Sequence, residues 1–290
     1  KRGEEKTCKA VEEGGRGEWK TETERGGANN AGYLDRITRI DRHVAQLVAD
    51  LEEDGLLEDT FIFYFGDHGG VLPRSKGYVY ESGLHVPLVV RVPDNWKHLV
   101  DPAPGARLAG FVSFVDFGPT VLHLAGIEVP AAVDGTPFMG PGLSASDVNL
   151  RQETFGHADR FDEKYDLVRS LRRGRYKYIR NFEAHYPDGL QNNYRYRMLA
   201  YTQWRDLYIS GDLNPAQSVF FERKAREALY DLEADPSEVH NLAADPDHAQ
   251  RLVQLRTSLP RRPKRMPDRR LLPSSTHRQA ALHHPRATGH

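Results

Sequence analysis

An aspartate–histidine pair lies in a glycine-rich segment in the first third of the sequence. Asp67 and His68 follow the apolar run "TFIFYF" and are flanked by three glycines. A carboxylate oxygen and an imidazole nitrogen can both bind a divalent metal ion, and glycine lets the backbone approach a ligand closely. Calcium takes about six to eight ligands and catalytic zinc about three from the protein. The pair therefore needs ligands from elsewhere, and on the dipeptide alone a turn-capping aspartate beside a solvated histidine is the simpler interpretation.

Lys76 lies further along the same loop, between Arg74 and Gly77. Its ammonium group could hold an oxyanion as a compact point charge, although a solvated loop lysine explains the residue equally well. The sequence contains no His-Glu-x-x-His helix, no Gly-x-Ser-x-Gly turn and no phosphate-binding Gly-Lys-Ser/Thr loop. Its one cysteine, Cys8, excludes an internal disulfide framework and a thiolate zinc cluster.

The residues on either side of this loop predict an α/β arrangement. Apolar residues spaced by three and four positions between Gly32 and Asp54 predict an amphipathic helix. The runs "FIFYF" at 61–65 and "VPLVVRV" at 86–92 predict two strands. Because continuous apolarity indicates burial on both faces, we expect parallel strands covered by helices. Asp67 and His68 would then follow the carboxyl end of a buried strand, where open α/β sheets bind their ligands.

The second half of the sequence predicts different elements. Asp116 can cap a short helix that ends at Gly126. Residues 167–182 alternate around an Arg-Gly turn and predict an antiparallel hairpin. A short strand ending near Leu232 should be followed by a turn and a helix. The change from apolar to alternating strands places a domain boundary near residue 150.

Composition limits the classes of partner. The 290 residues carry 40 basic and 41 acidic side chains, a net charge of -1, which argues against nucleic-acid binding. No apolar run approaches the roughly 18 residues of a membrane helix, so we expect no transmembrane segment. Residues 1–30 and 261–290 have few apolar residues and are expected to be disordered or non-native extensions. The second of these is strongly basic, so contact with an anionic surface is an alternative.

The string "GDHGG...PRSKGYVYESGLHVPLVVRVP" resembles the sulfatase family of the alkaline-phosphatase-like superfamily. Further blocks follow in that family's order, namely "DLEEDGLLEDT" before it and "FVSFVDFGPTVLHLAGIEVP", "RSLRRGRYKYIRNF" and "ALYDLEADPSEVHNLA" after it. The resemblance covers about residues 31–258. It implies an α/β fold in which 31–150 form part of a mainly parallel sheet sandwiched by helices. Residues 151–260 would form a small antiparallel C-terminal subdomain with a closing helix.

The resemblance also implies a chemistry. Sulfatases hydrolyse sulfate esters or sulfamates with a formylglycine nucleophile, made from Cys or Ser, while a calcium ion and basic side chains hold the sulfate oxygens. By this resemblance Asp67 and His68 are metal ligands, and Lys76 is the catalytic, sulfate-contacting lysine. Arg74 and His85 lie in the same loop and are further substrate-binding candidates. The implied substrate is a sulfated small molecule or carbohydrate. A periplasmic or secreted location suits the family, but no signal is visible in this chain.

The sequence departs from the family in one important respect. The nucleophile motif, Cys or Ser followed by x-Pro-x-Arg, is absent, because Cys8 is followed by "KAVEE". The family's early aspartate pair, which supplies further metal ligands, is missing too. We therefore expect the second half of a sulfatase that is inactive on its own. A phosphoryl-transfer hydrolase of the same superfamily is an alternative, although a two-metal site would need more His and Asp ligands. A non-catalytic binding module is the other alternative.

Overall fold

A computed structural model describes residues 24–70 and 73–259 of the chain, with side chains described from residue 31 onward. Cys8 and the predicted extension 261–290 lie outside these residues, as does most of the predicted extension 1–30. The exception is the stretch 24–30. It was expected to be irregular, but it is helical. Its residues extend the apolar-periodic helix toward the N-terminus by about two turns.

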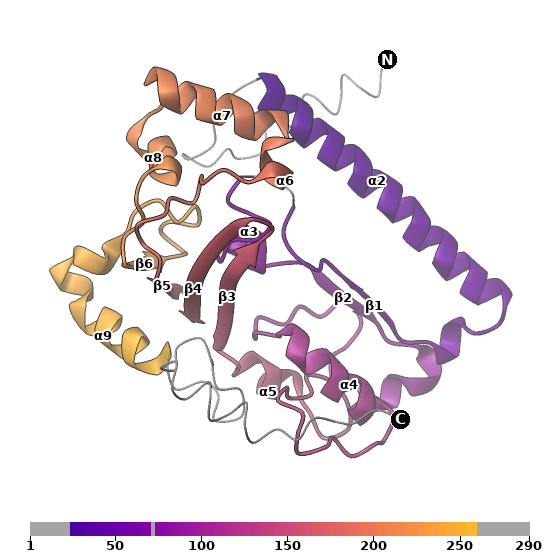
Figure 1. Ribbon diagram of the computed structural model, residues 1–290. Coiled ribbons are helices and arrows are strands. Elements are labelled where there is room, and N and C mark those ends of the chain that lie inside the picture. The colour runs from indigo at the N-terminus through magenta and orange to yellow at the C-terminus, as the bar shows by residue number, and fades with distance from the viewer. Residues whose placement is uncertain (1–23, 71–72, 260–290) are drawn as a thin grey trace, which may run out of the picture.

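The described residues form helices and strands around two separate sheets (Figure 1). The helices are α2 (Glu24–Glu53), α3 (Glu81–Leu84), α4 (Phe117–Leu124), α5 (Ala145–Asn149), α6 (Asn193–Tyr196), α7 (Leu199–Ser210), α8 (Pro215–Ser218) and α9 (Ala249–Ser258). The strands are β1 (Ile62–Phe65), β2 (Leu88–Arg91), β3 (Glu153–Phe161), β4 (Lys164–Arg173), β5 (Tyr176–Asn181) and β6 (Glu227–Asp231). This architecture confirms the predicted α/β class with an antiparallel C-terminal sheet.

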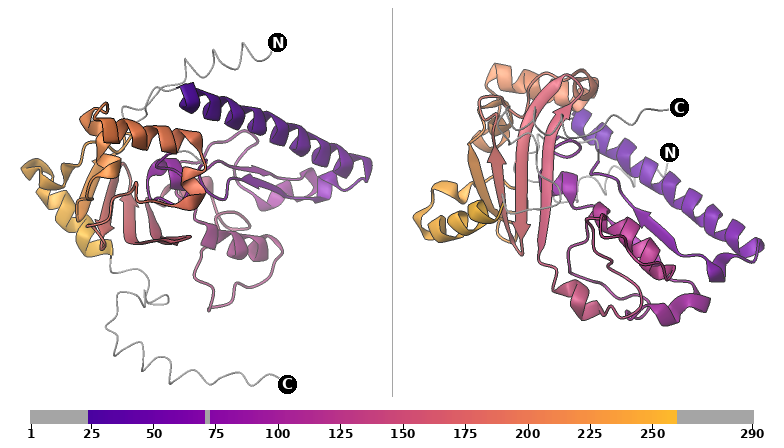
Figure 2. Two further views of the ribbon diagram at one scale, coloured as in Figure 1. Left: turned by 45° about the horizontal axis from the view of Figure 1, so that its top comes forward. Right: turned by 60° about the horizontal axis from the view of Figure 1, so that its bottom comes forward.

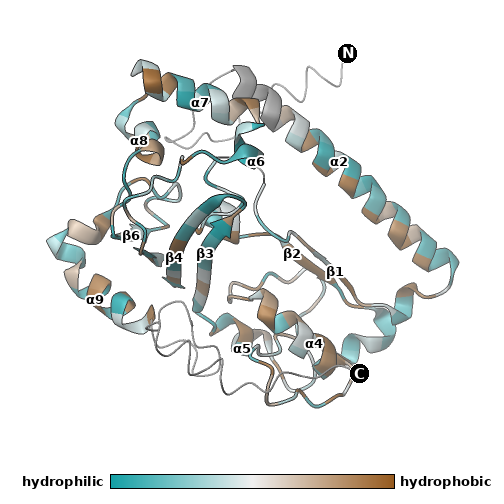
Figure 3. Cartoon of the chain, in the orientation of Figure 1, coloured by the Kyte–Doolittle hydropathy of each residue, from teal (hydrophilic) through white to brown (hydrophobic). Residues whose placement is uncertain are grey.

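Helix α2 confirms the helix predicted from apolar spacing, and Gly55 ends it. Gly55 adopts a φ of 72°, and the amide of Leu56 donates a hydrogen bond to the carbonyl oxygen of Leu51 at 2.9 Å. A left-handed glycine of this kind satisfies the last free carbonyl groups of a helix. The helix contacts α7 and runs alongside β1 and β2, and Figure 3 shows its surface as mainly hydrophilic with scattered apolar positions. No helix in the described part of the chain is long and apolar enough to cross a membrane.

Strands β1 and β2 form a two-stranded sheet, and they are antiparallel, so the predicted parallel pairing is wrong. Phe63 lies opposite Val90, and the hydrogen bond from the Gly66 amide to the Pro87 carbonyl oxygen at 3.2 Å extends the ladder beyond the strands. Burial on both faces is wrong as well, because the side chain of Tyr64 is exposed. Helix α4 packs against the other face without covering it, since the rings of Phe65 and Phe117 lie 4.9 Å apart and Phe65 stays 42% exposed. Apolar content alone does not specify the direction of the partner strand.

The four-stranded sheet has the order β3-β4-β5-β6, and every neighbouring pair is antiparallel. Strands β4 and β5 are the predicted hairpin, with Gly174 in the turn at a φ of 55°. Strand β6 ends at Asp231 as expected, and α9 is the closing helix. Strand β3 was not predicted from its mainly polar sequence. It lies at the edge of the sheet and pairs with β4.

The two faces of this sheet are covered by different parts of the chain (Figure 2). On one face Leu171 and Tyr178 pack against Leu255 of α9. On the other face Val168 and Ile179 pack against Val79, which belongs to the loop that follows β1. Alternation along each strand sends successive side chains to opposite faces, so the sheet can bury both. The loop with the candidate site residues is therefore part of the core of the C-terminal sheet.

Candidate functional site

The Asp67–His68 pair follows β1 directly and lies at the surface. His68 Nδ1 is 2.7 Å from the carbonyl oxygen of Gly69, and its Nε2 is 3.4 Å from Oδ2 of Asp67. A carbonyl oxygen only accepts hydrogen bonds, so Nδ1 is the donor to Gly69, while Nε2 faces Oδ2 of Asp67. The side chain of Asp67 is 83% exposed and that of His68 is 35% exposed. One carboxylate oxygen and one ring nitrogen are thus adjacent and accessible.

This arrangement of the histidine matches the environment of a metal ligand. Histidines that bind metals commonly donate the hydrogen of their second ring nitrogen to a carbonyl or carboxylate oxygen, which fixes the tautomer. The donor set of Asp67 and His68 fits a divalent ion, but it is incomplete. Within residues 24–70 and 73–259, no group of three or more His, Cys, Asp or Glu side chains could hold an ion. Further His, Cys, Asp or Glu ligands would come from outside this part of the chain.

Close backbone packing holds the loop that follows the pair. The amide of Gly69 donates to the carbonyl oxygen of Gly83 at 3.0 Å, and Ser75 Oγ donates to the carbonyl oxygen of Ser82 at 2.6 Å. A Cβ atom on Gly69 would lie 1.8 Å from that Ser82 oxygen, and one on Gly83 would lie 2.4 Å from the Ser75 carbonyl oxygen. Only glycine allows two backbone segments to approach so closely. The sequence prediction of a tight glycine loop is confirmed in this respect.

Lys76 is joined to the same loop through its backbone and to a distant segment through its side chain. Its amide donates to the carbonyl oxygen of Gly70 at 3.2 Å, two residues after His68. Its Nζ donates to the hydroxyl oxygen of Tyr194 at 3.1 Å and lies 5.0 Å from the centre of that ring. The lysine backbone is therefore close to the Asp67–His68 segment. Its half-buried side chain is directed toward Tyr194 of α6.

Arg74 does not have the environment expected of a substrate-binding residue. Its guanidinium group is buried and donates to the carbonyl oxygens of Ser237 at 2.9 Å and of Glu238 at 2.8 Å. It also lies 4.1 Å from the centre of the Tyr80 ring. The structure therefore separates Arg74 from the accessible pair, and the residue connects the loop to the segment after β6.

His85 differs from Arg74 in that it is 75% exposed. Its Nδ1 lies 3.7 Å from Oε2 of Glu81 at the start of α3. The other oxygen of Glu81 is 3.1 Å from Nζ of the buried Lys177, which in turn lies 3.0 Å from Oε1 of Glu238. Burial raises the pKa of Glu238 above its ordinary value, although Lys177 opposes the rise. His85 is thus the accessible end of a buried charge network.

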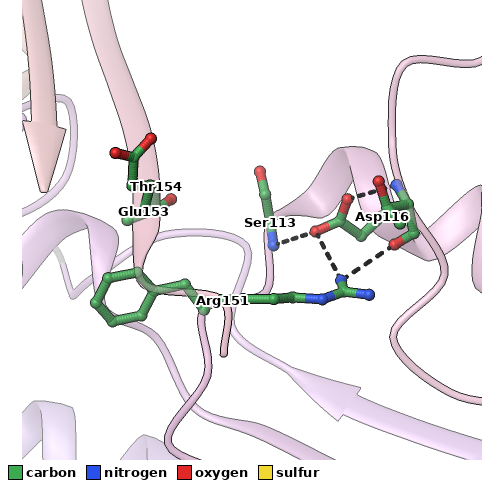
Figure 4. Close-up of a pocket in the computed structure, with 7 residues that line it drawn as sticks. Ser113, Asp116, Arg151, Glu153 and Thr154 are labelled. Carbon is green, nitrogen blue, oxygen red and sulfur yellow. Dashed lines mark hydrogen bonds and ion pairs between the residues drawn. The ribbon is translucent and has the colours of Figure 1, made fainter. Parts of the chain in front are cut away.

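A separate pocket of about 280 Å³ lies between α4 and β3 and does not include the predicted site residues (Figure 4). Asp116 is buried in its wall and accepts hydrogen bonds from the amides of Ser113 and Thr136, both at 2.9 Å. Arg151 Nη1 lies 3.9 Å from the same carboxylate. These polar groups satisfy one another and hold the start of α4 against the loop at 136. The polar residues of this pocket therefore have a structural role.

Two residues near the candidate site were not found by sequence reasoning, namely Tyr194 and Glu238. Tyr194 touches Lys76 from 118 positions away, and Glu238 accepts from the Glu81 amide from 157 positions away. Neither contact has a local pattern in the sequence, because both depend on how the C-terminal sheet packs against the loop.

Comparisons with known proteins agree on one family. The family model described as sulfatase matches residues 2–127, and the model described as "N-sulphoglucosamine sulphohydrolase, C-terminal" matches residues 66–191. An ulvan-active sulfatase of Formosa agariphila is 37% identical over 227 residues, which are 78% of this chain and 36% of that protein. Human N-sulphoglucosamine sulphohydrolase is 25% identical over 246 residues, which are 80% of this chain and 47% of that protein. The chain thus spans less than half the length of these two relatives.

A solved structure shares the fold. It is that of a protein in complex with its substrate D-glucosamine-2-N,6-O-disulfate. The TM-score is 0.57 at 20% sequence identity, and the match covers 91% of this chain and 43% of the other. At this identity the likeness supports the architecture alone.

Proposed function

The chain belongs to the sulfatase family, and from this premise we propose that it supplies Asp67, His68 and Lys76 to the active site of a sulfuric ester hydrolase. Asp67 and His68 bind a divalent metal ion, and Lys76 binds the sulfate group. Arg74 is not proposed to bind substrate, because its side chain is buried. The exposed His85 is a candidate substrate-binding residue. Because the chain spans less than half of its relatives, the proposal concerns the activity of the whole protein.

The observation that carries this proposal is the proximity of a ring nitrogen of His68 to a carboxylate oxygen of Asp67. The Gly69 carbonyl oxygen, 2.7 Å from Nδ1, orients the His68 ring, and Nε2 of that ring lies 3.4 Å from the exposed carboxylate of Asp67. Two ligand atoms of different residues are then directed to one accessible point immediately after β1. The family implies a divalent metal, and we propose calcium, for which carboxylate oxygen is a preferred ligand. The imidazole would be its nitrogen ligand.

Each residue of the chain has a separate task in the proposed reaction. A bound divalent ion supplies positive charge that stabilises the negative charge growing on the sulfate oxygens. Lys76 supplies a second positive charge, which is held in place by the hydrogen bond that its Nζ donates to Tyr194. The Gly69 carbonyl oxygen keeps His68 in one orientation. The formylglycine nucleophile would come from another part of the whole protein, because this sequence lacks its Cys/Ser-x-Pro-x-Arg motif.

The proposed substrate is a sulfated carbohydrate. One relative is named for activity on ulvan, another for N-sulphoglucosamine, and the solved structure with the same fold contains a disulfated glucosamine. All three names describe sulfate groups carried by sugars or polysaccharides.

A chimera tests the proposal. Residues 31–258 would replace the matching segment of the Formosa agariphila ulvan-active sulfatase, and release of inorganic sulfate from ulvan would be measured with and without calcium. We expect Asp67→Ala and Lys76→Ala to lower the rate by at least about a hundredfold, as is usual for removal of a group that stabilises transition-state charge. Asp94→Ala and Lys97→Ala are matched controls, since these side chains are 76% and 74% exposed.

The outcomes separate the competing functions. Activity retained in the Asp67→Ala chimera would contradict the metal-site assignment. A chimera that releases phosphate from phosphate esters but no sulfate would favour the phosphoryl-transfer alternative. A folded chimera that releases neither would favour a non-catalytic role.

A further inference from the structure

Tyr194 is the residue that connects the proposed sulfate-binding lysine to the C-terminal part of the chain. Its hydroxyl oxygen accepts a hydrogen bond from Lys76 Nζ at 3.1 Å. Its side chain is 36% exposed, so part of the ring faces solvent next to the ammonium group. This surface joins the apolar face of an aromatic ring to a positively charged group that can bind an anion.

The ring of Tyr194 is held in place from behind. The ring of Phe161, at the end of β3, packs edge-on against it with centres 5.2 Å apart. The completely buried Asn192 accepts from the Arg195 amide at 3.0 Å and donates to the Phe161 carbonyl oxygen at 2.9 Å. Glu163 accepts from the Asn193 amide at 2.5 Å. The short helix α6 is therefore fastened to the β3–β4 hairpin at its N-terminal end.

Arg195 fastens the same helix to the lysine loop. It is buried, and its guanidinium group lies 4.1 Å from the centre of the Tyr78 ring and 4.7 Å from that of Phe161. Its Nη2 donates to the Gly77 carbonyl oxygen at 3.5 Å. A Cβ atom on Gly77 would lie 2.8 Å from that nitrogen, and the φ of Gly77 is 82°. The backbone next to Lys76 thus sits directly on Arg195, and the Lys76–Tyr194 contact joins two fixed supports.

We propose that Tyr194 is a specificity-determining residue, which positions Lys76 and provides the face against which the sugar ring of a sulfated carbohydrate packs. The inference deepens the proposed function and rests on it. Ligand sites are lined mainly by apolar and aromatic side chains with a few placed polar groups. Tyr194 combines the two, since its ring offers apolar area. Its hydroxyl accepts from the lysine and keeps its own hydrogen to donate to a substrate oxygen.

Binding measurements on the full 290-residue chain test this role. D-glucosamine-2-N,6-O-disulfate and inorganic sulfate would each be titrated calorimetrically in calcium-containing buffer into the wild type, Tyr194→Ala, Tyr194→Phe and Lys76→Met. Tyr186→Ala is the control, because Tyr186 is 38% exposed and its ring packs 4.1 Å from that of His185. Thermal melting of each variant shows that it is folded. Inorganic sulfate has no ring to pack on tyrosine. A comparison of the two probes therefore separates packing against the sugar ring from positioning of Lys76.

We expect Tyr194→Ala to weaken binding of the disulfated sugar about tenfold, equivalent to about 1.4 kcal/mol. Binding of inorganic sulfate should weaken at most about threefold. Tyr194→Phe, which keeps the ring, should retain most of the sugar affinity, and Lys76→Met should lose both ligands. An equal change for both probes in Tyr194→Ala, or no change, would overturn the role of Tyr194 alone. If the wild type binds neither probe, or if Lys76→Met binds both normally, Lys76 does not bind sulfate and this inference fails, whereas the hydrolytic activity of the whole protein is judged by the chimera.

Discussion

The guanidinium group of Arg74 donates a hydrogen bond to the main-chain oxygen of Glu238 at 2.8 Å, across 164 positions of sequence. The two residues connect the loop after β1 with the segment after β6. Both also have positive φ angles, 59° for Arg74 and 54° for Glu238. A strained backbone persists only where its surroundings hold it, so this contact fixes the geometry of the loop that contains Lys76. The C-terminal sheet therefore has a direct part in shaping the candidate site.

Arg74→Met should destabilise the protein by about 2–4 kcal/mol. The substitution removes two hydrogen bonds from a charged group and leaves two carbonyl oxygens in a buried position without their donor. Urea unfolding measures the change, and Arg205→Met on α7, where the side chain is 37% exposed, is the control. A loss no greater than that of the control would show that Arg74 does not anchor the loop.

Gly69→Ala should be poorly tolerated, while Gly118→Ala should be close to neutral. The new Cβ at position 69 would lie 1.8 Å from a backbone oxygen, whereas at position 118 nothing lies within 4 Å. Gly118 is within α4, where alanine is the better helix former. Comparison of the two melting temperatures checks this, and the expected difference corresponds to more than about 2 kcal/mol. Equal melting temperatures would mean that the loop can open without cost.

Lys177→Met should cost more stability at pH 8 than at pH 5. Lys177 faces the buried carboxylate of Glu238 at 3.0 Å, and burial already raises the pKa of Glu238. Without the lysine that pKa should rise further. When the pKa of a carboxyl group is raised in the folded state, the folded protein holds a proton that the unfolded chain releases. The free energy of unfolding therefore falls as the pH rises from the unfolded pKa to the folded one. Breaking a buried pair costs about 3–5 kcal/mol, and urea titrations at the two pH values would measure the difference. A pH-independent loss would contradict this account.

Alkaline conditions should weaken the fold between about pH 10 and pH 12. Burial, with a hydrogen bond to Glu227, raises the pKa of Tyr178 to about 12. Across this window the folded tyrosine keeps a proton that the unfolded chain loses, so the free energy of unfolding falls as the pH rises. Tyr178→Phe should remove up to about 2–3 kcal/mol of this fall, at 1.36 kcal/mol per pKa unit. Tyr165→Phe, at an exposed tyrosine, should leave it unchanged.

The family, the class of fold and the elements whose pattern is local could be predicted from the sequence. The periodic spacing in α2, the alternation around Gly174 and the helix ending before Gly126 all appear in the structure as predicted. These features can be read from sequence because each depends on side chains within a few positions of one another. The Asp67–His68 pair was also identified in this way, and its role as a metal site stays a prediction.

How these elements meet could not be predicted, because it depends on contacts between distant parts of the chain. An apolar run shows that a strand is apolar, but the direction of its partner depends on the loop that returns the chain, and β1 and β2 proved antiparallel. A loop arginine looks the same in sequence whether it faces solvent or core, and Arg74 is buried. Lys76 finds Tyr194 only because the C-terminal sheet packs on the loop between β1 and β2. Contacts across more than a hundred positions arise from the packing of whole elements, so no local pattern encodes them.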